Sequence, residues 1–235
     1  MNGMCGRYSI AVEPSLIEER FGATVGGAMQ PRYNAAPSQL LPVILNADPG
    51  KIVFSHWGIR PVWMSHVSKK DGLINVRYET LRDKATFRTD LALRRCLIPA
   101  NGFYEWNAVS GSKVPFRITR SDGKLFAFAG LWQEGSGEPS VLPRFAIITT
   151  AADAFMQPIH ARMPVILDPE EEKAWIEKDA DLGDLLRLLE TPYSSPMRAY
   201  EVSRDVNRAS VDVPDLIRPA DHAADDAPLF KAARK

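Results

Sequence analysis

The sequence predicts an α+β domain built around a mostly antiparallel, barrel-like β-sheet with a few flanking helices. Short runs rich in β-branched and aromatic residues, bounded by turn residues, recur along most of the chain and outnumber the helical patterns. These runs do not alternate regularly with helices, which argues against a doubly wound parallel sheet. At 235 residues, 45% of them hydrophobic, the chain can bury a sizeable core.

The individual elements follow from local composition and periodicity. Seven runs have the composition of strands: Gly6–Ile10, Leu41–Leu45, Lys51–Trp57, Arg95–Ile98, Pro115–Thr119, Lys124–Leu131 and Arg144–Thr150. Four segments have helical patterns: Pro14–Phe21, Glu79–Lys84, Pro169–Glu177 and Leu182–Glu190. Proline followed by three glutamates is typical of a helix start, which supports the helix at Pro169. Leucines spaced i, i+3, i+4 and i+7 give the last helix a core-facing stripe.

The chain is expected to form one domain over residues 4–211. The first three residues, Met1–Gly3, are interpreted as a leader or upstream extension. Residues 212–235 are rich in Ala, Asp and Pro, and we expect them to form a disordered tail. The polar segment His66–Gly72 interrupts the apolar pattern and is predicted to be a loop.

Composition excludes several classes of protein. The 29 basic residues balance the 29 acidic ones, which argues against coating nucleic acid by bulk electrostatics. No apolar run is long enough to span a bilayer, and no secretory leader is recognisable. Two cysteines, Cys5 and Cys96, make a disulfide framework improbable, so we expect a cytoplasmic protein. The histidines are scattered, and we expect neither a metal site nor an organic cofactor.

Cys5 is the most informative residue of the sequence. Once everything before it is removed, it carries a free α-amine and a thiol on adjacent carbons. Such a 1,2-aminothiol attacks an aldehyde first with nitrogen and then with sulfur, closing a five-membered ring. It also has the makeup of an N-terminal nucleophile whose own amine is the base. The alternative is a small buried hydrophobe, a common role of free cysteine.

Three other segments carry candidate chemistry. Glu105 lies between aromatic residues after an apolar strand, a setting that raises a carboxyl pKa and suits acid/base work; the alternative is pairing with an arginine. If the segment around His160 and Arg162 is extended, both side chains point to the same side, where one could transfer protons and the other bind phosphate. The alternative is that His160 has a structural role. Asn75 and Arg77 have the same spacing, which suits binding of a sugar or phosphate oxygen.

Aromatic residues interleaved with cations form a further candidate. Trp57 and Trp63 lie close in sequence to Lys69, Lys70 and Arg77. This combination suits stacking of single-stranded bases, whereas core packing is the commoner role of tryptophan. Core packing is the role expected for the remaining tryptophans, Trp106, Trp132 and Trp175.

The ordered set of motifs closely resembles the SRAP family, the SOS response-associated peptidases. The resemblance covers about residues 4–210. Its blocks are Cys-Gly-Arg-Tyr, Arg-Tyr-Asn-x-Ala-Pro, Trp-Gly-x-x-Pro-x-Trp, Asn-x-Arg-x-Glu-Thr, Arg-Arg-Cys-Leu-x-Pro-x-x-Gly-Phe-Tyr-Glu-Trp, Phe-Ala-Gly-Leu-Trp, Ile-x-Thr-x-Ala and His-x-Arg-Met-Pro-Val-Ile-Leu. After Val206-Asn207 the chain departs from the family pattern, which puts contacts made by that loop in doubt.

The resemblance implies a specific activity. Family members bind single-stranded DNA at abasic sites and join the N-terminal cysteine to the sugar aldehyde as a thiazolidine, which protects the lesion in the DNA damage response. Carried over by motif, the catalytic residues are Cys5, Asn75, Glu105 and His160. The DNA-binding residues expected are Arg7, Trp63, Arg77 and Arg162. The expected partner is single-stranded DNA containing abasic sites. The protein is expected to be a monomer in the cytoplasm, associated with the nucleoid.

Two alternatives stay open at this point. One is a cysteine-type (auto)peptidase that uses Cys5 with Glu105 and His160, and the other is a DNA-binding module without a covalent step. In each covalent reading the active form is expected to begin at Cys5. Initiation at Met4 or self-cleavage of the Met4–Cys5 bond would produce that terminus.

Overall fold

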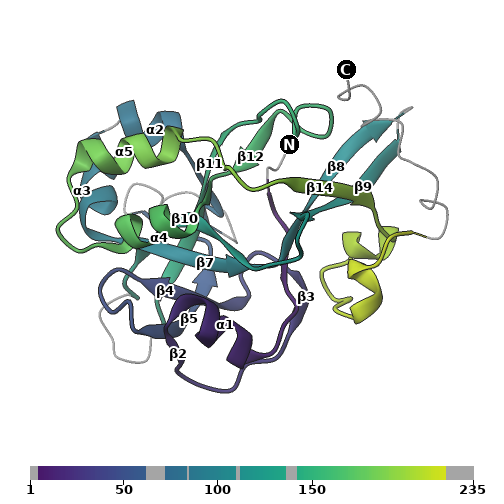
Figure 1. The fold of residues 1–235 in the computed structure, drawn as a ribbon, viewed down its shortest axis with the longest axis horizontal. Helices are drawn as coiled ribbons and strands as arrows, with labels where there is room; N and C mark the ends of the chain where they lie inside the picture. The colour runs from purple at the N-terminus through teal and green to yellow at the C-terminus, as the bar shows by residue number, and fades with distance from the viewer. Residues whose placement is uncertain (1–4, 62–71, 84, 110–111, 136–141, 221–235) are drawn as a thin grey trace.

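The computed structural model describes residues 5–61, 72–83, 85–109, 112–135 and 142–220 (Figure 1). Its helices are α1 (Pro14–Phe21), α2 (Tyr78–Asp83), α3 (Ala85–Leu93), α4 (Pro169–Ile176) and α5 (Leu182–Glu190), with the 3₁₀ turns η2 (Arg204–Asn207) and η3 (Pro214–Ile217). Its strands are β1 (Tyr8–Ile10), β2 (Thr24–Val25), β3 (Arg32–Ala35), β4 (Leu40–Leu45), β5 (Lys51–Trp57), β6 (Asn75–Arg77), β7 (Arg95–Ala100), β8 (Gly102–Val109), β9 (Ser112–Arg120), β10 (Phe126–Gln133), β11 (Arg144–Ala151), β12 (Arg162–Pro164), β13 (Ile166–Leu167) and β14 (Met197–Glu201).

The larger sheet closes on itself. Antiparallel pairings run through β5, β4, β7, β10 and β11, and a parallel pairing of β11 with β5 completes the ring. At this closure Phe145 lies opposite Trp57, and their rings stack with centroids 6.1 Å apart. Closure removes the exposed edges of an open sheet, so the predicted barrel-like, mostly antiparallel α+β fold is confirmed.

The smaller sheet, in the order β14-β9-β8-β1-β3, packs against this barrel. Tyr8 of β1 directs its ring into the barrel core, where its centroid lies 5.2 Å from Trp57 and 5.8 Å from Phe128. Phe103 of β8 also contacts Phe128, at 5.9 Å. The smaller sheet therefore presents β1 and β8 side by side to the barrel, and these strands carry or adjoin the residues of the candidate site.

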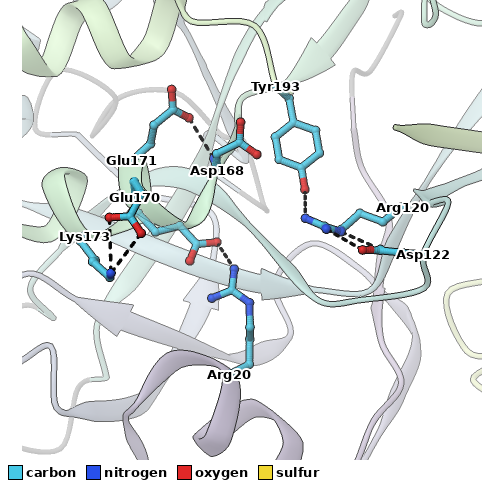
Figure 2. Close-up of polar contacts among 9 residues, drawn as sticks. Arg20, Arg120, Asp122, Asp168, Glu170, Glu171, Lys173 and Tyr193 are labelled. Atoms are coloured by element: carbon cyan, nitrogen blue, oxygen red, sulfur yellow. Dashed lines mark hydrogen bonds and ion pairs between the residues drawn. The ribbon is translucent and has the colours of Figure 1, made fainter. Parts of the chain in front are cut away.

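Helices α3, α4 and α5 pack together beside the barrel on the left of Figure 1. The glutamates that predicted the start of α4 have separate roles. Glu171 accepts the Asp168 N–H at 2.9 Å, and Glu172 binds Arg20 of α1 at 2.9 Å (Figure 2). In the same view Arg120 joins Asp122 at the β9–β10 turn to Tyr193, which lies before β14. These contacts fix α1 and α4 on the outside of the barrel.

The segment of residues 203–219, here called the C-terminal clasp, packs against the smaller sheet and corrects the expectation that disorder begins at residue 212. The Asp212 carboxylate accepts the backbone N–H groups of Tyr33 and Asn34 in β3 at 2.6 and 2.9 Å. Leu216 is 1% exposed in a second apolar cluster that contains Tyr104. Residues 212–220 are therefore part of the folded domain, and residues 221–235 lie outside the described part of the chain.

Most expected elements are present with nearly the expected bounds. Those predicted at Pro14–Phe21, Lys51–Trp57 and Leu182–Glu190 match residue for residue. The sequence interpretation missed several elements, among them β3, β8 and α3. The loop predicted at His66–Gly72 lies, apart from Gly72, outside the described residues.

Candidate active site

Cys5 is fully buried just before β1, and its backbone nitrogen donates to Glu105 Oε1 at 2.6 Å. In this chain that nitrogen is the peptide amide shared with Met4, and it marks the place of the α-amine in a form that begins at Cys5. Asn75 Nδ2 donates to the Cys5 carbonyl oxygen at 3.4 Å. Three of the predicted site residues therefore meet at one point, although they are far apart in sequence.

Strand pairing brings Cys5 to Glu105. β1 and β8 run antiparallel with Tyr8 opposite Phe103, and Tyr104 N–H donates to Arg7 O at 3.0 Å. Because side chains alternate along a strand, Tyr104 and Glu105 of β8 point to opposite faces. Tyr104 enters the second apolar cluster, and Glu105 points toward the start of β1.

The Glu105 carboxyl is 1% exposed, and burial raises its pKa to about 8. Hydrogen bonds from the N–H groups of Cys5 and Trp106 oppose this rise but do not cancel it. Burial also raises the pKa of the Cys5 thiol well above its usual value, and the nearby charge of Glu105 adds to the effect. Burial therefore favours the protonated carboxyl and the neutral thiol over their charged forms.

Asn75 and Arg77 lie two residues apart on β6, which pairs in parallel with β11. The sequence did not predict this strand, and its extended geometry directs both side chains to one face. Asn75 is half-buried and reaches Cys5, whereas Arg77 is exposed. An exposed cation thus lies next to the amide that contacts the cysteine.

His160 and Arg162 do not lie on one extended strand, which was the condition for predicting that their side chains point to the same side. His160 precedes β12, which begins at Arg162, and its Nδ1 lies 3.1 Å from the Arg162 backbone nitrogen. The Arg162 guanidinium forms an ion pair with Glu79, with Nη2 3.0 Å from Oε2, and donates to Thr149 O at 2.8 Å. Arg162 is therefore held in place by an acidic partner before any ligand is present.

Arg7 bonds to the C-terminal clasp. Its guanidinium donates to Val206 O at 2.6 Å and to Asn34 Oδ1 at 3.2 Å. Asn207 Oδ1 in turn accepts the Trp106 indole N–H at 2.7 Å. Arg7 and Trp106, which are close in sequence to Cys5 and Glu105, therefore bond to residues 206 and 207. The chain departs from the family pattern directly after these two residues. The predicted contact of Arg7 with DNA stays a prediction, and Trp63 lies outside the described residues.

The clasp contacts were missed by the sequence interpretation. Asn34 is completely buried, and its Nδ2 donates to the carbonyl oxygens of Val206 and Val211 at 3.2 and 2.8 Å. An asparagine inside the Arg-Tyr-Asn-x-Ala-Pro block was the available signal, but its partners lie more than 170 residues away. Trp132 and Trp175 are buried, as expected of core residues, whereas Trp106 is half-buried against the second apolar cluster.

Within the described ranges, no three His, Cys, Asp or Glu side chains are grouped closely enough to hold a metal ion. No helix among these residues has the length and apolar character needed to cross a membrane. Both cysteines are free and buried.

The fold and site define a barrel-based α+β protein with a cysteine-centred site. The family model of the SOS response associated peptidase (SRAP) matches residues 4–209, and the chain belongs to this family. It is 40% identical over 223 residues to abasic site processing protein YoqW of Bacillus subtilis, covering 91% of this chain and 99% of that protein. Abasic site processing protein HMCES of Mus musculus is 30% identical over 236 residues, covering 81% and 65% of the respective chains.

The fold is also found among solved structures. A crystal structure of a protein from Bacteroides thetaiotaomicron superimposes with a TM-score of 0.78 at 24% identity, covering 92% of this chain and all of that one. This likeness shows the fold.

Proposed function

We propose that this protein processes abasic sites in single-stranded DNA by forming a covalent thiazolidine through Cys5. The observation that carries the proposal is the 2.6 Å contact between the Cys5 nitrogen and the buried Glu105 carboxyl. It holds the nitrogen of a potential 1,2-aminothiol beside a buried carboxyl, and burial shifts the pKa of that carboxyl upward, toward the range that suits proton transfer near neutral pH. The protein's relatives in Bacillus subtilis and Mus musculus are abasic site processing proteins, which supports an abasic site as the substrate.

The reaction has two bond-forming steps. The Cys5 amine attacks the aldehyde carbon of the ring-opened sugar, and the resulting carbinolamine loses one water to give an imine. The Cys5 sulfur then attacks the imine carbon, and the thiol proton passes to nitrogen as the ring closes. One water is released overall, and no oxidant or reductant is needed. Glu105 is suited to open the closed sugar and to protonate the carbinolamine hydroxyl, which then departs as water.

The other site residues have supporting roles in this proposal. Asn75, which donates to the Cys5 carbonyl, also lies where it can hold a sugar oxygen. His160 relays protons during ring closure or its reversal. Arg77 binds a flanking phosphate, since it is exposed two residues from Asn75. Arg162 does the same after its guanidinium exchanges Glu79 for a phosphate.

Self-cleavage is a second candidate activity, favoured by the same contact. The Met4–Cys5 peptide nitrogen is the atom that Glu105 holds, so Glu105 can protonate it as the leaving amine once the Cys5 thiol attacks the Met4 carbonyl carbon. Water then hydrolyses the thioester, which leaves Cys5 with a free amine. The raised pKa of the Cys5 thiol lowers the fraction of nucleophilic thiolate, which slows this self-cleavage and disfavours a general protease alike.

The test uses single-stranded DNA with one uracil excised, followed by a denaturing gel and intact mass spectrometry. We expect wild type and Cys96→Ala to form an adduct equal to the summed masses minus one water, and Cys5→Ser to form none that survives denaturation. Borohydride reduction of the DNA beforehand should abolish the adduct, because it removes the aldehyde. An adduct that persists in Cys5→Ser or on reduced DNA contradicts the proposal. Binding without any adduct indicates a non-covalent module.

A further inference from the structure

Asn107 follows Glu105 by two residues on β8. The β8–β9 register is regular from Phe103 opposite Ile118 to Val109 opposite Ser112, so no bulge separates the two side chains. They therefore point to the same face of the strand, about 7 Å apart along it. Asn107 is 9% exposed, and its Nδ2 donates to the carbonyl oxygen of Pro158 at 2.5 Å.

Pro158 lies two residues before His160, in the loop that connects β11 to β12. This loop has its own internal hydrogen bonds: the N–H of His160 donates to Met156 O at 3.0 Å, and Asp153 Oδ1 accepts the Met156 N–H at 2.8 Å. Met156 and Ile159 anchor it in the core, at 1% and 5% exposure. The bond from Asn107 attaches this loop to the strand that carries Glu105.

We propose that Asn107 is a positioning residue that sets the place of His160 relative to Glu105. The inference rests on the proposed function, in which these two groups move protons at one reacting carbon. General acid/base catalysis needs its groups within hydrogen-bond reach of the atoms they serve, and small misplacements lower the rate. Because β8 is paired in regular register with β9 over both Glu105 and Asn107, one strand holds Glu105 directly and His160 through Asn107.

A purely structural role makes a different prediction. A buried asparagine that satisfies a loop carbonyl contributes to stability, and its loss then affects rate and stability without regard to His160. A positioning residue acts through another group, so its effect disappears when that group is removed. A double-mutant cycle between Asn107 and His160 separates the two roles.

The experiment measures single-turnover crosslinking at saturating protein on the abasic single strand. Asn107→Leu removes the donor without adding charge, and Asn107→Ser is a smaller change that shortens its reach. We expect each to slow crosslinking about tenfold or more in the wild-type background and less than about twofold in the His160→Ala background. Affinity for borohydride-reduced abasic DNA, which cannot react, should stay within about twofold of wild type.

Asn46→Leu is the control at a second buried asparagine. Asn46 is 4% exposed, donates to Leu93 O at 3.2 Å and accepts the N–H groups of Arg95 and Trp132 at 3.0 and 3.1 Å, so its substitution removes at least as much buried hydrogen bonding. Its fold-effect on rate should be the same with and without His160. The positioning role is overturned if the Asn107 variants lose the same factor in both backgrounds, if folded variants react at the wild-type rate, or if His160→Ala has no effect. Absence of any wild-type adduct would instead refute the proposed function.

Discussion

Replacing Glu105 with glutamine should make the protein more stable at alkaline pH and less active. Burial raises the pKa of this carboxyl from its usual 4.5 to about 8. The folded protein therefore keeps a proton on Glu105 over a pH range in which the unfolded chain has lost it. Stability falls as the pH rises from about 4.5 to about 8, because the unfolded state binds fewer protons there, and the loss is complete above that range.

The size of the effect follows from the same two pKa values. A difference between 4.5 and about 8, at about 1.4 kcal/mol for each tenfold change, corresponds to about 5 kcal/mol at pH 9. Glutamine does not ionise and keeps an oxygen that can accept the Cys5 N–H. We expect Glu105→Gln to recover about 2–5 kcal/mol at pH 9 and to differ little from wild type at pH 4.

Urea unfolding at the two pH values measures this difference directly. At pH 9 the melting temperature of the variant should also rise, by about 2–4 °C per kcal/mol for a chain of this size. Glu79→Gln is a control of opposite sign, because the Arg162 hydrogen bond lowers the Glu79 pKa and so stabilises the folded state above pH 4.5. A gain for Glu105→Gln that is equal at both pH values would refute the reasoning. Crosslinking by this more stable variant should be slower, by about 100-fold or more.

Two further predictions concern the DNA and the N-terminus. Arg77→Ala should weaken binding to single strands with and without an abasic site, and should reduce the slope of log affinity against log salt by about 0.7, the value for one phosphate contact. Arg218→Ala, at an exposed arginine, is the control and should leave both the affinity and the slope unchanged. An unaltered slope in Arg77→Ala would exclude the phosphate contact. Protein that forms the adduct should begin at Cys5 when its intact mass is measured, since a peptide nitrogen cannot form an imine, and a full-yield, heat-stable adduct on protein that retains residues 1–4 would contradict the mechanism.

The sequence predicted elements best where one apolar periodicity ran without interruption. The leucine stripe of α5 and the β-branched run of β5 each indicate a single geometry, and both were located correctly. β8 was missed because Glu105 and Asn107 place polar groups on its inward face, which hides the alternation expected of a half-buried strand. β3 was missed for a similar reason: its buried residue Asn34 is polar, and its partners come from the clasp.

The candidate site was predicted as a set of residues, and its contacts came from the tertiary structure. Aromatic neighbours of Glu105 correctly indicated a raised pKa. No feature of the neighbouring sequence indicated that Glu105 accepts a hydrogen bond from the Cys5 nitrogen. That contact depends on strand pairing that brings together residues 100 apart in the chain. The ion pair between Glu79 and Arg162 was equally hidden, since the spacing of His160 and Arg162 says nothing about a carboxylate on helix α2.

The hydrogen bonds of Arg7 to the clasp have a consequence for the order of synthesis. The segment around Cys5 leaves the ribosome before the clasp, because the carbonyl oxygens of Val206 and Asn207 that hold Arg7 are made 199 and 200 residues after it. A nascent chain therefore holds Cys5 and Arg7 without the clasp until residues 206 and 207 have been made. A chain released before the clasp is translated keeps Cys5 but lacks the contacts that hold the neighbouring Arg7.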